Sequence, residues 1–288
     1  MRLPLPLAAL LAAALLGCAT PAAPPALSGE RIAAIVASPD RSDADRTNDQ
    51  RRHPAELLAF IGVQPGWTAL DVSTGGGYTT ELLARAIGPG GAVYGQSQPR
   101  DPNKAPPRPA APEGGAAPVA AAPAASEPAR RSTAEVLAAR VEKMQAAGVA
   151  AAPIAYVGQR FDDPVPPALA DGRLDLVTLM FNYHDFGFLG VDRTAMNRAV
   201  FRALKPGGLY VIADHAGRPG TGISESGTLH RIEESFLRSE VEAAGFQLLD
   251  AGSFLHNPAD PRDRETPEPP MPKDEFILKF VKPGAAGG

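Results

Sequence analysis

A short apolar run, three consecutive glycines and an amphipathic segment follow one another between Trp67 and Ile87. The run is typical of a buried strand, and the amphipathic segment of a helix that ends at a Gly-Pro pair. The glycines Gly75 to Gly77 permit left-handed backbone conformations and let a ligand approach the main chain closely. The N-terminus of the following helix offers free N–H groups to a polar ligand. This strand–turn–helix unit predicts a nucleotide-type binding turn.

The residues after the turn narrow the kind of nucleotide. No Gly-Lys-Ser/Thr sequence follows the glycines, so the turn lacks the residues that bind a nucleoside triphosphate and its magnesium ion. The spacing also departs from G-x-G-x-x-G, the pattern of dinucleotide-binding turns. An ordinary tight turn without a ligand is the alternative interpretation.

Strand and helix patterns alternate through the rest of the chain, which predicts a doubly wound α/β sheet. Beyond the first strand, strands are expected at residues 92–96, 154–157, 174–181, 209–213, 246–249 and 276–281. Helices are expected at residues 30–37, 54–61, 132–147, 196–204 and 230–244. The helix at 132–147 opens on Ser-Thr-Ala-Glu, a capping-box sequence.

Two motifs resemble the class I S-adenosylmethionine-dependent methyltransferases. Asp71, Gly75 and Gly77 fall on the family's first motif, roughly D/E-x-G-x-G-x-G after a strand, with Ser73 in place of its first glycine. The segment L-K-P-G-G-L-Y-V-I-A-D at residues 204–214 closely resembles a later turn and strand of that family. The resemblance covers about residues 54–283 and implies a Rossmann-like, seven-stranded sheet with an antiparallel last strand. It also implies S-adenosylmethionine as the cofactor.

The resemblance assigns cofactor-binding residues by position. These are Asp71, Ser73, Gly75, Gly77, Gln96, Asp162, Asp163 and Asn182. Asp71 is expected to order the glycine turn, which admits the methionine part of the cofactor. Gln96 is expected to face the ribose, where an acidic residue is usual. Asp162 or Asp163 is expected to contact the adenine, with simple turn formation as the alternative, and Asn182 is expected near the methyl donor.

Candidate catalytic residues follow the fourth strand, since ligands of parallel sheets lie beyond the carboxyl ends of the strands. His184 is expected to act as a base that Asp185 orients. The alternative is that Asn182 and Asp185 cap a loop and that His184 packs on the cofactor without proton transfer. Asp214 and His215 form a second such pair after the fifth strand. No metal is expected, because no ligand spacing within a single element supports a metal site.

The composition allows one sizeable core and gives no sign of nucleic-acid binding. The chain has 288 residues, 44% of them apolar, and a net charge of −4 with both signs mixed. Residues 97–130 are rich in proline, alanine and glycine, which predicts a disordered insertion within a single domain formed by 30–96 and 131–283. Residues 284–288 are expected to form a flexible tail.

The N-terminal segment predicts export. Met1 and Arg2 are followed by an apolar run that is too short to span a membrane and ends in Gly17-Cys18. This ending resembles a bacterial lipoprotein signal and implies cleavage before Cys18, acylation of its thiol, and a tether over 19–29. The expected location is the periplasmic face of a bacterial membrane. A plain secretory signal is the alternative. With a single cysteine, an intramolecular disulfide is excluded.

Together these patterns predict an S-adenosylmethionine-dependent methyltransferase with an unknown, small-molecule acceptor. Export counts against this function, because the methyl donor is a cytoplasmic metabolite. The alternative is therefore a non-catalytic, membrane-tethered ligand-binding protein with the same fold. A nicotinamide-dependent oxidoreductase is disfavoured by the Lys-Pro-Gly-Gly strand pattern and the antiparallel ending.

Overall fold

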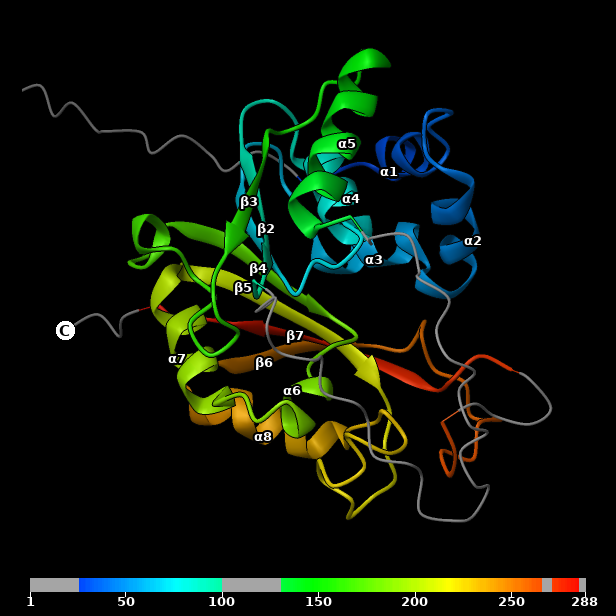
Figure 1. Cartoon of the computed structure of the whole chain (residues 1–288), viewed down its shortest axis with the longest axis vertical. Coiled ribbons are helices and arrows are strands. Elements are labelled where there is room, and N and C mark those ends of the chain that lie inside the picture. The colour runs from blue at the N-terminus through cyan, green and yellow to red at the C-terminus, as the bar shows by residue number, and fades with distance from the viewer. Residues whose placement is uncertain (1–25, 100–130, 266–270, 285–288) are drawn as a thin grey trace, which may run out of the picture.

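A seven-stranded mixed sheet runs through the centre of the molecule (Figure 1). The structure is a computed structural model that describes residues 26–99, 131–265 and 271–284. The strand order is β3-β2-β1-β4-β5-β7-β6. All neighbours are parallel except β7, which is antiparallel to both β5 and β6. The predicted fold class is confirmed. The strands are β1 (Thr68–Val72), β2 (Ala92–Ser97), β3 (Ile154–Gly158), β4 (Leu174–Met180), β5 (Leu204–His215), β6 (Gln247–Gly252) and β7 (Glu275–Val281).

Helices cover both faces of this sheet, and each face has its own apolar core. On one side lie α1 (Gly29–Val36), α2 (Asp43–Arg52), α3 (Pro54–Ile61), α4 (Tyr78–Ile87) and α5 (Thr133–Ala146). On the other side lie α6 (Asp185–Phe188), α7 (Arg193–Ala203) and α8 (Glu234–Ala243), with the short 3₁₀ helix η1 (Pro167–Leu169) beside β4 in the chain. Because β1 and β4 are central and covered on both faces, their side chains are almost all buried.

Local sequence signals account for several helix ends. Ser132 and Glu135 form the predicted capping box at the start of α5. Pro54 occupies the first turn of α3, where its missing N–H costs nothing. Gly62 ends the same helix in a left-handed conformation with φ 72°. These boundaries agree with the sequence-based predictions.

The start of α8 does not agree. The apolar spacing predicts a helix from His230, but α8 begins at Glu234. Ile232 forms an isolated parallel bridge with Ala216, and the backbone of His230 is left-handed with φ 52°. The last residues before the helix are therefore held in extended contact with the end of β5, and this tertiary pairing overrides the local pattern.

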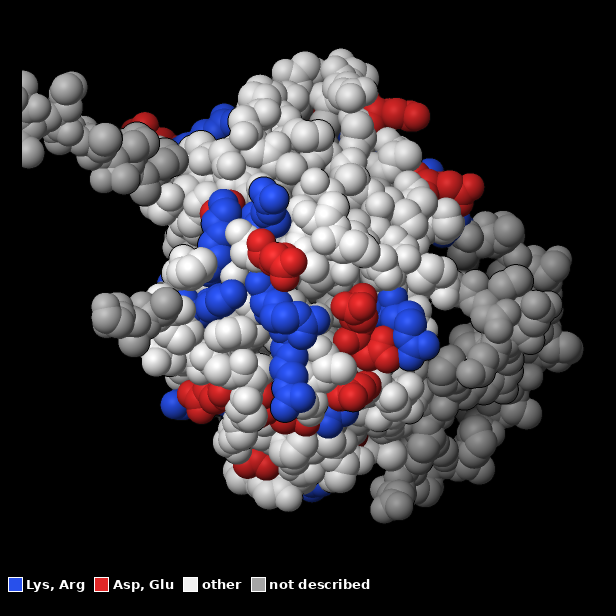
Figure 2. Space-filling model, turned by 90° about the vertical axis from the view of Figure 1, so that its left-hand side faces the viewer, with Lys and Arg blue, Asp and Glu red and all other residues white. Residues whose placement is uncertain are grey.

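Several predicted segments lie outside the described residues. They are the signal sequence with Cys18, most of the tether, residues 100–130 of the predicted insertion, and residues 285–288 of the tail. Within the described ranges, no helix combines the length and apolar character needed to cross a membrane. Figure 2 shows one face of the molecule, on which a central band of basic side chains has acidic side chains directly beside it.

Candidate functional site

The glycine turn joins β1 to α4 at the carboxyl edge of the sheet. Ser73, Gly75 and Gly77 all have left-handed backbones, with φ values of 57°, 53° and 74°. A Cβ atom on Gly77 would lie 2.7 Å from Cδ2 of Leu137 in α5. Glycine is therefore required there both by the backbone conformation and by close packing against α5.

Asp71 is buried directly beneath this turn. Its carboxylate accepts hydrogen bonds from the hydroxyls of Thr80 in α4, at 2.6 Å, and Thr178 in β4, at 2.8 Å. Burial raises the pKa of Asp71, and the hydrogen bonds from the threonines oppose that rise. The carboxylate thus connects the two central strands to the helix that follows the turn.

A cavity of about 210 Å³ opens over the turn. It lies between the carboxyl ends of β1 and β4 and the helix α2, whose sequence is rich in charged residues. This volume is below the ~300–1,000 Å³ of sites for drug-sized ligands, so it would enclose only part of a nucleoside cofactor. Its lining is mostly polar and includes charges of both signs, and consists of Asp45, Asn48, Arg52, Asp71, Ser73, Thr74, Gly75, Gly76, Tyr78, Thr79, Arg140, Met180 and Asn182.

Arg140 connects the components of the cavity wall. From α5 it donates to both carboxylate oxygens of Asp45 in α2, at 2.8 and 2.9 Å. It also donates to the carbonyl of Gly76, at 2.6 Å, and to Glu81 in α4, at 2.5 Å. The positive charge of Arg140 is therefore already neutralised by its carboxylate partners.

Arg52 is the second arginine that lines the cavity, and it differs from Arg140 in its partners. Its guanidinium lies 3.9 Å from the centroid of the Phe181 ring. Among the described residues, no carboxylate forms an ion pair with it. Burial, together with the adjacent charge of Arg51, lowers the pKa of Arg52 to about 10. A partly desolvated cation without a carboxylate partner is well placed to receive an anionic group of a ligand.

Half of the predicted cofactor residues reach this cavity. Asp71, Ser73, Gly75 and Asn182 line it, whereas Gly77, Gln96, Asp162 and Asp163 do not.

Gln96 is fully buried, and both ends of its amide are occupied. The carbonyl accepts from the backbone N–H of Ser73 at 3.0 Å, and the NH₂ group donates to the backbone carbonyl of Gln159 at 2.7 Å. The prediction that this side chain faces a ribose is therefore wrong for this structure. Gln96 instead holds the glycine turn to the loop after β3.

This bridge makes a prediction about a single substitution. Gln96→Glu should lower the free energy of unfolding by about 1–3 kcal/mol, because a carboxylate cannot donate to the carbonyl of Gln159 and would repel it. Urea denaturation followed by circular dichroism measures the change. Gln247→Glu, on the exposed side of β6, is the control and should change stability by less than about 0.5 kcal/mol. Unchanged stability of Gln96→Glu would contradict the bridging role.

The two aspartates after β3 form a turn away from the cavity. Asp162 accepts two hydrogen bonds from Arg160, at 2.8 and 2.6 Å, and this pairing lowers the pKa of Asp162. The backbone N–H of Asp163 donates to the carbonyl of Arg160. The turn-forming alternative thus describes the contacts of both residues, and a contact of either one with adenine stays a prediction.

Beyond β4, His184 is buried between two carboxylates. Its Nδ1 lies 2.6 Å from Oδ1 of Asp214 at the end of β5, and its Nε2 lies 3.1 Å from Oδ1 of Asp185. Burial alone would lower the pKa of His184, but the charge of Asp214 and the hydrogen bonds to both carboxylates raise it to about 10. Burial would likewise raise the pKa of Asp185, but His184 lowers it to about 2.

This arrangement corrects the predicted division of roles. An imidazole that is protonated at neutral pH and bonded at both nitrogens has no lone pair with which to accept a proton. His184 is therefore unsuited to be the base in this state. The side chain that orients it is Asp214, through Nδ1, in addition to Asp185. The expected pairing of Asp214 with His215 also changes. Asp214 accepts a hydrogen bond from the backbone N–H of His215, and the ring of His215 lies 5.3 Å from that of His184 in a tilted arrangement.

One further side chain reaches this cluster and was missed from the sequence. Nδ1 of His230 lies 3.1 Å from Oδ1 of Asp185. The apolar spacing had placed His230 at the start of a helix, so its side chain received no role. The sequence offered one indirect indication of a role for His230, which is that it follows β5 in the chain. The carboxyl end of β5 lies at the same edge of the sheet as that of β4.

Comparisons with known proteins identify the fold. No protein-family model matches the sequence, and no curated protein sequence matches it significantly. The fold is similar to that of an S-adenosylmethionine-dependent methyltransferase from Aquifex aeolicus, with a TM-score of 0.51, 16% identity, and coverage of 88% of this chain and 98% of that one. A chain of the complex between the Haloferax volcanii Trm112 methyltransferase activator and a methyltransferase is similar with a TM-score of 0.52 and 19% identity. The match covers 90% of this chain and 100% of that one. A Bacillus halodurans protein described as a methyltransferase is similar with a TM-score of 0.50 and 16% identity, over 80% of this chain and 98% of that one.

These likenesses define the architecture as the class I methyltransferase fold. At such low identity they carry the fold alone, and function has to be argued from the site.

Proposed function

We propose that the protein is an S-adenosylmethionine-dependent methyltransferase that acts on a small-molecule acceptor. The observation that carries this proposal is the polar cavity over the glycine turn, at the carboxyl edge of β1 and β4. Ligands of open parallel sheets bind at this edge. The cavity belongs to a seven-stranded sheet with an antiparallel last strand, in a fold similar to that of the Aquifex aeolicus methyltransferase.

The charges of the wall suit the amino-acid end of the cofactor. Arg52 would bind the carboxylate of the methionine part, since its guanidinium has no carboxylate partner among the described residues. Asp45 and the backbone of Gly75 and Gly76 also line the cavity and would receive the ammonium group. Asp71, Ser73 and Asn182 complete the proposed binding set.

The proposed reaction is an in-line displacement. The acceptor forms a bond to the methyl carbon, the bond from that carbon to the sulfonium breaks, and the electron pair remains on sulfur. The cofactor supplies the leaving group, so the protein mainly has to position the two reactants and exclude water. Asn182 links the cavity to the acceptor side, because its amide donates to Oδ2 of Asp185 at 3.0 Å.

The N-terminal sequence motivates a second part of the proposal. We infer that the chain is exported and lipid-anchored at Cys18. A non-catalytic, membrane-tethered binding protein with this fold is then the competing function, because export separates the protein from its cytoplasmic methyl donor. Arg52, which has no carboxylate partner in the part of the chain that the structure describes, suits either function, so the ligand has to be identified directly.

Calorimetry with S-adenosylhomocysteine provides the test. We expect the full-length protein to bind it with micromolar affinity, and Arg52→Met to bind at least tenfold more weakly, because a charge-assisted hydrogen bond contributes about 1.5–3 kcal/mol. Arg198→Met, on the exposed side of α7, is the matched control and should bind normally. No detectable binding by the unaltered protein would contradict the proposal and favour a different ligand.

A further inference from the structure

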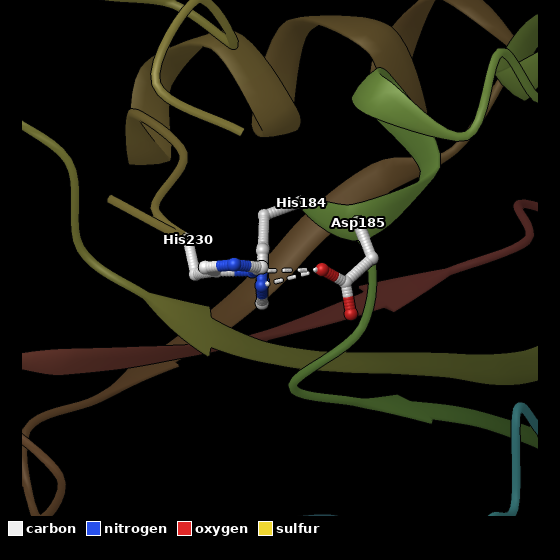
Figure 3. Close-up of side chains that lie close together, drawn as sticks. All are labelled: His184, Asp185 and His230. Carbon is white, nitrogen blue, oxygen red and sulfur yellow. Dashed lines mark hydrogen bonds and ion pairs between the residues drawn. The ribbon is translucent and has the colours of Figure 1, made fainter. Parts of the chain in front are cut away.

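Three side chains converge beyond the carboxyl ends of β4 and β5 (Figure 3). His184 and Asp185 come from the start of α6, and His230 comes from the loop that precedes α8. One ligand atom from each of the three lies within 4.8 Å of the other two. We propose that His184, Asp185 and His230 bind a divalent transition-metal ion, against the expectation from the sequence that no metal site is present.

The distances suit a shared ion. Oδ1 of Asp185 lies 3.1 Å from Nε2 of His184 and 3.1 Å from Nδ1 of His230. Ligand atoms bound about 2.1 Å from one ion lie about 3.0 Å apart in octahedral geometry and about 3.4 Å apart in tetrahedral geometry. Both of these separations fall in this range. The ligand nitrogens of the two histidines lie within 4.8 Å of each other, so side-chain rotations would complete the geometry around one ion.

The donor set selects the class of metal. Two imidazole nitrogens and one carboxylate oxygen suit zinc, iron, cobalt, nickel or manganese, whereas magnesium and calcium prefer oxygen ligands alone. To bind through Nε2, His184 would release the proton on that nitrogen to solvent, because a histidine ligand is neutral. Three protein ligands leave coordination positions open to water or a substrate, as in catalytic rather than structural sites.

The atoms that do not face the ion are independently fixed. Asp214 bonds to Nδ1 of His184 at 2.6 Å and so directs Nε2 toward the cluster. Asn182 bonds to Oδ2 of Asp185 at 3.0 Å and so leaves Oδ1 for the ion. A carboxylate behind a histidine ligand and a hydrogen bond behind a carboxylate ligand are the usual outer partners of metal sites, where they fix the tautomer and the orientation of the ligands.

The third ligand is held by its backbone. His230 has a left-handed φ of 52°, which is uncommon for a residue with a side chain. The adjacent Arg231 is fully buried and pairs with Asp260 at 2.8 Å. Ile232 forms the bridge with Ala216 at the end of β5. These contacts hold His230 at the cluster from a loop rather than from a helix.

An ion could enter from solvent and meet a substrate. The side chain of His184 is only 4% exposed, but those of Asp185 and His230 are 23% and 20% exposed. The site thus has one closed side and one open side. Asn182 joins it to the cofactor cavity, since this residue both lines the cavity and bonds to Asp185.

The role of the ion, unlike its binding, rests on the proposed methyl transfer. An acceptor hydroxyl bound at an open coordination position would lose its proton to solvent water more readily. Its oxygen would then form the bond to the methyl carbon as the carbon–sulfur bond breaks, with the electron pair left on the sulfur. The substrate class inferred is therefore a small molecule with a hydroxyl group whose oxygen receives the methyl group.

Metal binding is tested on the full-length protein after treatment with a chelator. Titration with Co²⁺, followed by its visible absorption, and elemental analysis after incubation with Zn²⁺ should both give one ion per chain. His230→Asn should bind Co²⁺ at least tenfold more weakly, and Asp185→Asn provides a second variant if the first fails to fold. His256→Asn is the control, because this partly exposed histidine pairs with Asp274 outside the cluster and should leave Co²⁺ affinity unchanged.

The outcomes separate the two proposals. Failure of the unaltered protein to bind Co²⁺ and Zn²⁺, or equal Co²⁺ affinity in the unaltered protein and both cluster variants, overturns the metal site. Calorimetry with S-adenosylhomocysteine on the same proteins tests the proposed function separately. Loss of Co²⁺ binding in His230→Asn, with S-adenosylhomocysteine binding retained, supports a metal site on the acceptor side of the cavity.

Discussion

Replacing Arg85 with methionine is expected to lower the free energy of unfolding by about 3–5 kcal/mol at neutral pH. Arg85 lies in α4 with a side chain that is 3% exposed. It donates to Glu81 at 3.0 and 2.7 Å, and to Asp40 at 3.1 and 2.5 Å. Asp40 belongs to the segment between α1 and α2. Removing the guanidinium would leave carboxylates with little solvent around them and would detach the N-terminal helices from α4.

The pH dependence of this effect follows from Asp40. Its hydrogen bond from Arg85 lowers the pKa of Asp40 from 3.8 to about 2. A carboxyl group with a lowered pKa stabilises the fold above its unfolded pKa and loses that contribution as the pH falls through the folded pKa. The difference in free energy of unfolding between the original protein and Arg85→Met should therefore have its largest value above pH 4 and should decrease toward pH 2.

Urea denaturation at a series of pH values measures both effects. Arg238→Met is the control, because the Arg238–Glu242 pair is exposed and should contribute less than about 1 kcal/mol. A difference that stays constant down to pH 2 would show that the lost stability comes from packing of the Arg85 side chain rather than from its pairing with Asp40.

The architecture could be predicted from the sequence because its signals are local. The run from Leu174 to Met180 is almost continuously apolar, as expected of a buried parallel strand, and it became β4. The antiparallel final strand followed from the resemblance and from the apolar run at its position. Each of these features depends on residues that are adjacent in the chain.

The site could be predicted only in part, because its contacts join distant residues. The sequence placed Gln96 at the end of β2, but its partners are backbone groups of Ser73 and Gln159, which no local pattern encodes. It likewise placed His184 and Asp214 after neighbouring strands without indicating that the two side chains pair. Strand position indicates the edge at which a side chain lies but not the atom that it contacts.

His230 shows how a local pattern can mislead. The spacing of Phe236, Leu237 and Val241 is helical, and extending it backwards gave His230 a place in the helix. The bridge between Ala216 and Ile232 instead holds the segment against β5. The buried ion pair of Arg231 contributes to the same tertiary anchor, and its loss should have the second large effect.

Replacing Arg231 with methionine is expected to lower the free energy of unfolding by about 3–5 kcal/mol, because Asp260 would remain as an unpaired buried charge. Arg231 also donates to the backbone carbonyls of Ala216, at 3.0 Å, and Arg264, at 3.1 Å. Asp260 and Arg264 lie beyond α8 in the chain, and Ala216 directly follows β5. Without them the loop should move away from β5, and Co²⁺ affinity should fall at least tenfold.

Stability and Co²⁺ affinity have to be measured on the same variant, since a shared anchor predicts that both fall. Arg160→Met is the control, because the Arg160–Asp162 pair is largely exposed and far from the cluster in the chain, so both quantities should stay nearly unchanged. Reduced stability with unaltered Co²⁺ affinity would mean that the backbone of His230 keeps its position without Arg231. The bridge between Ala216 and Ile232 would then be sufficient to hold the loop against β5.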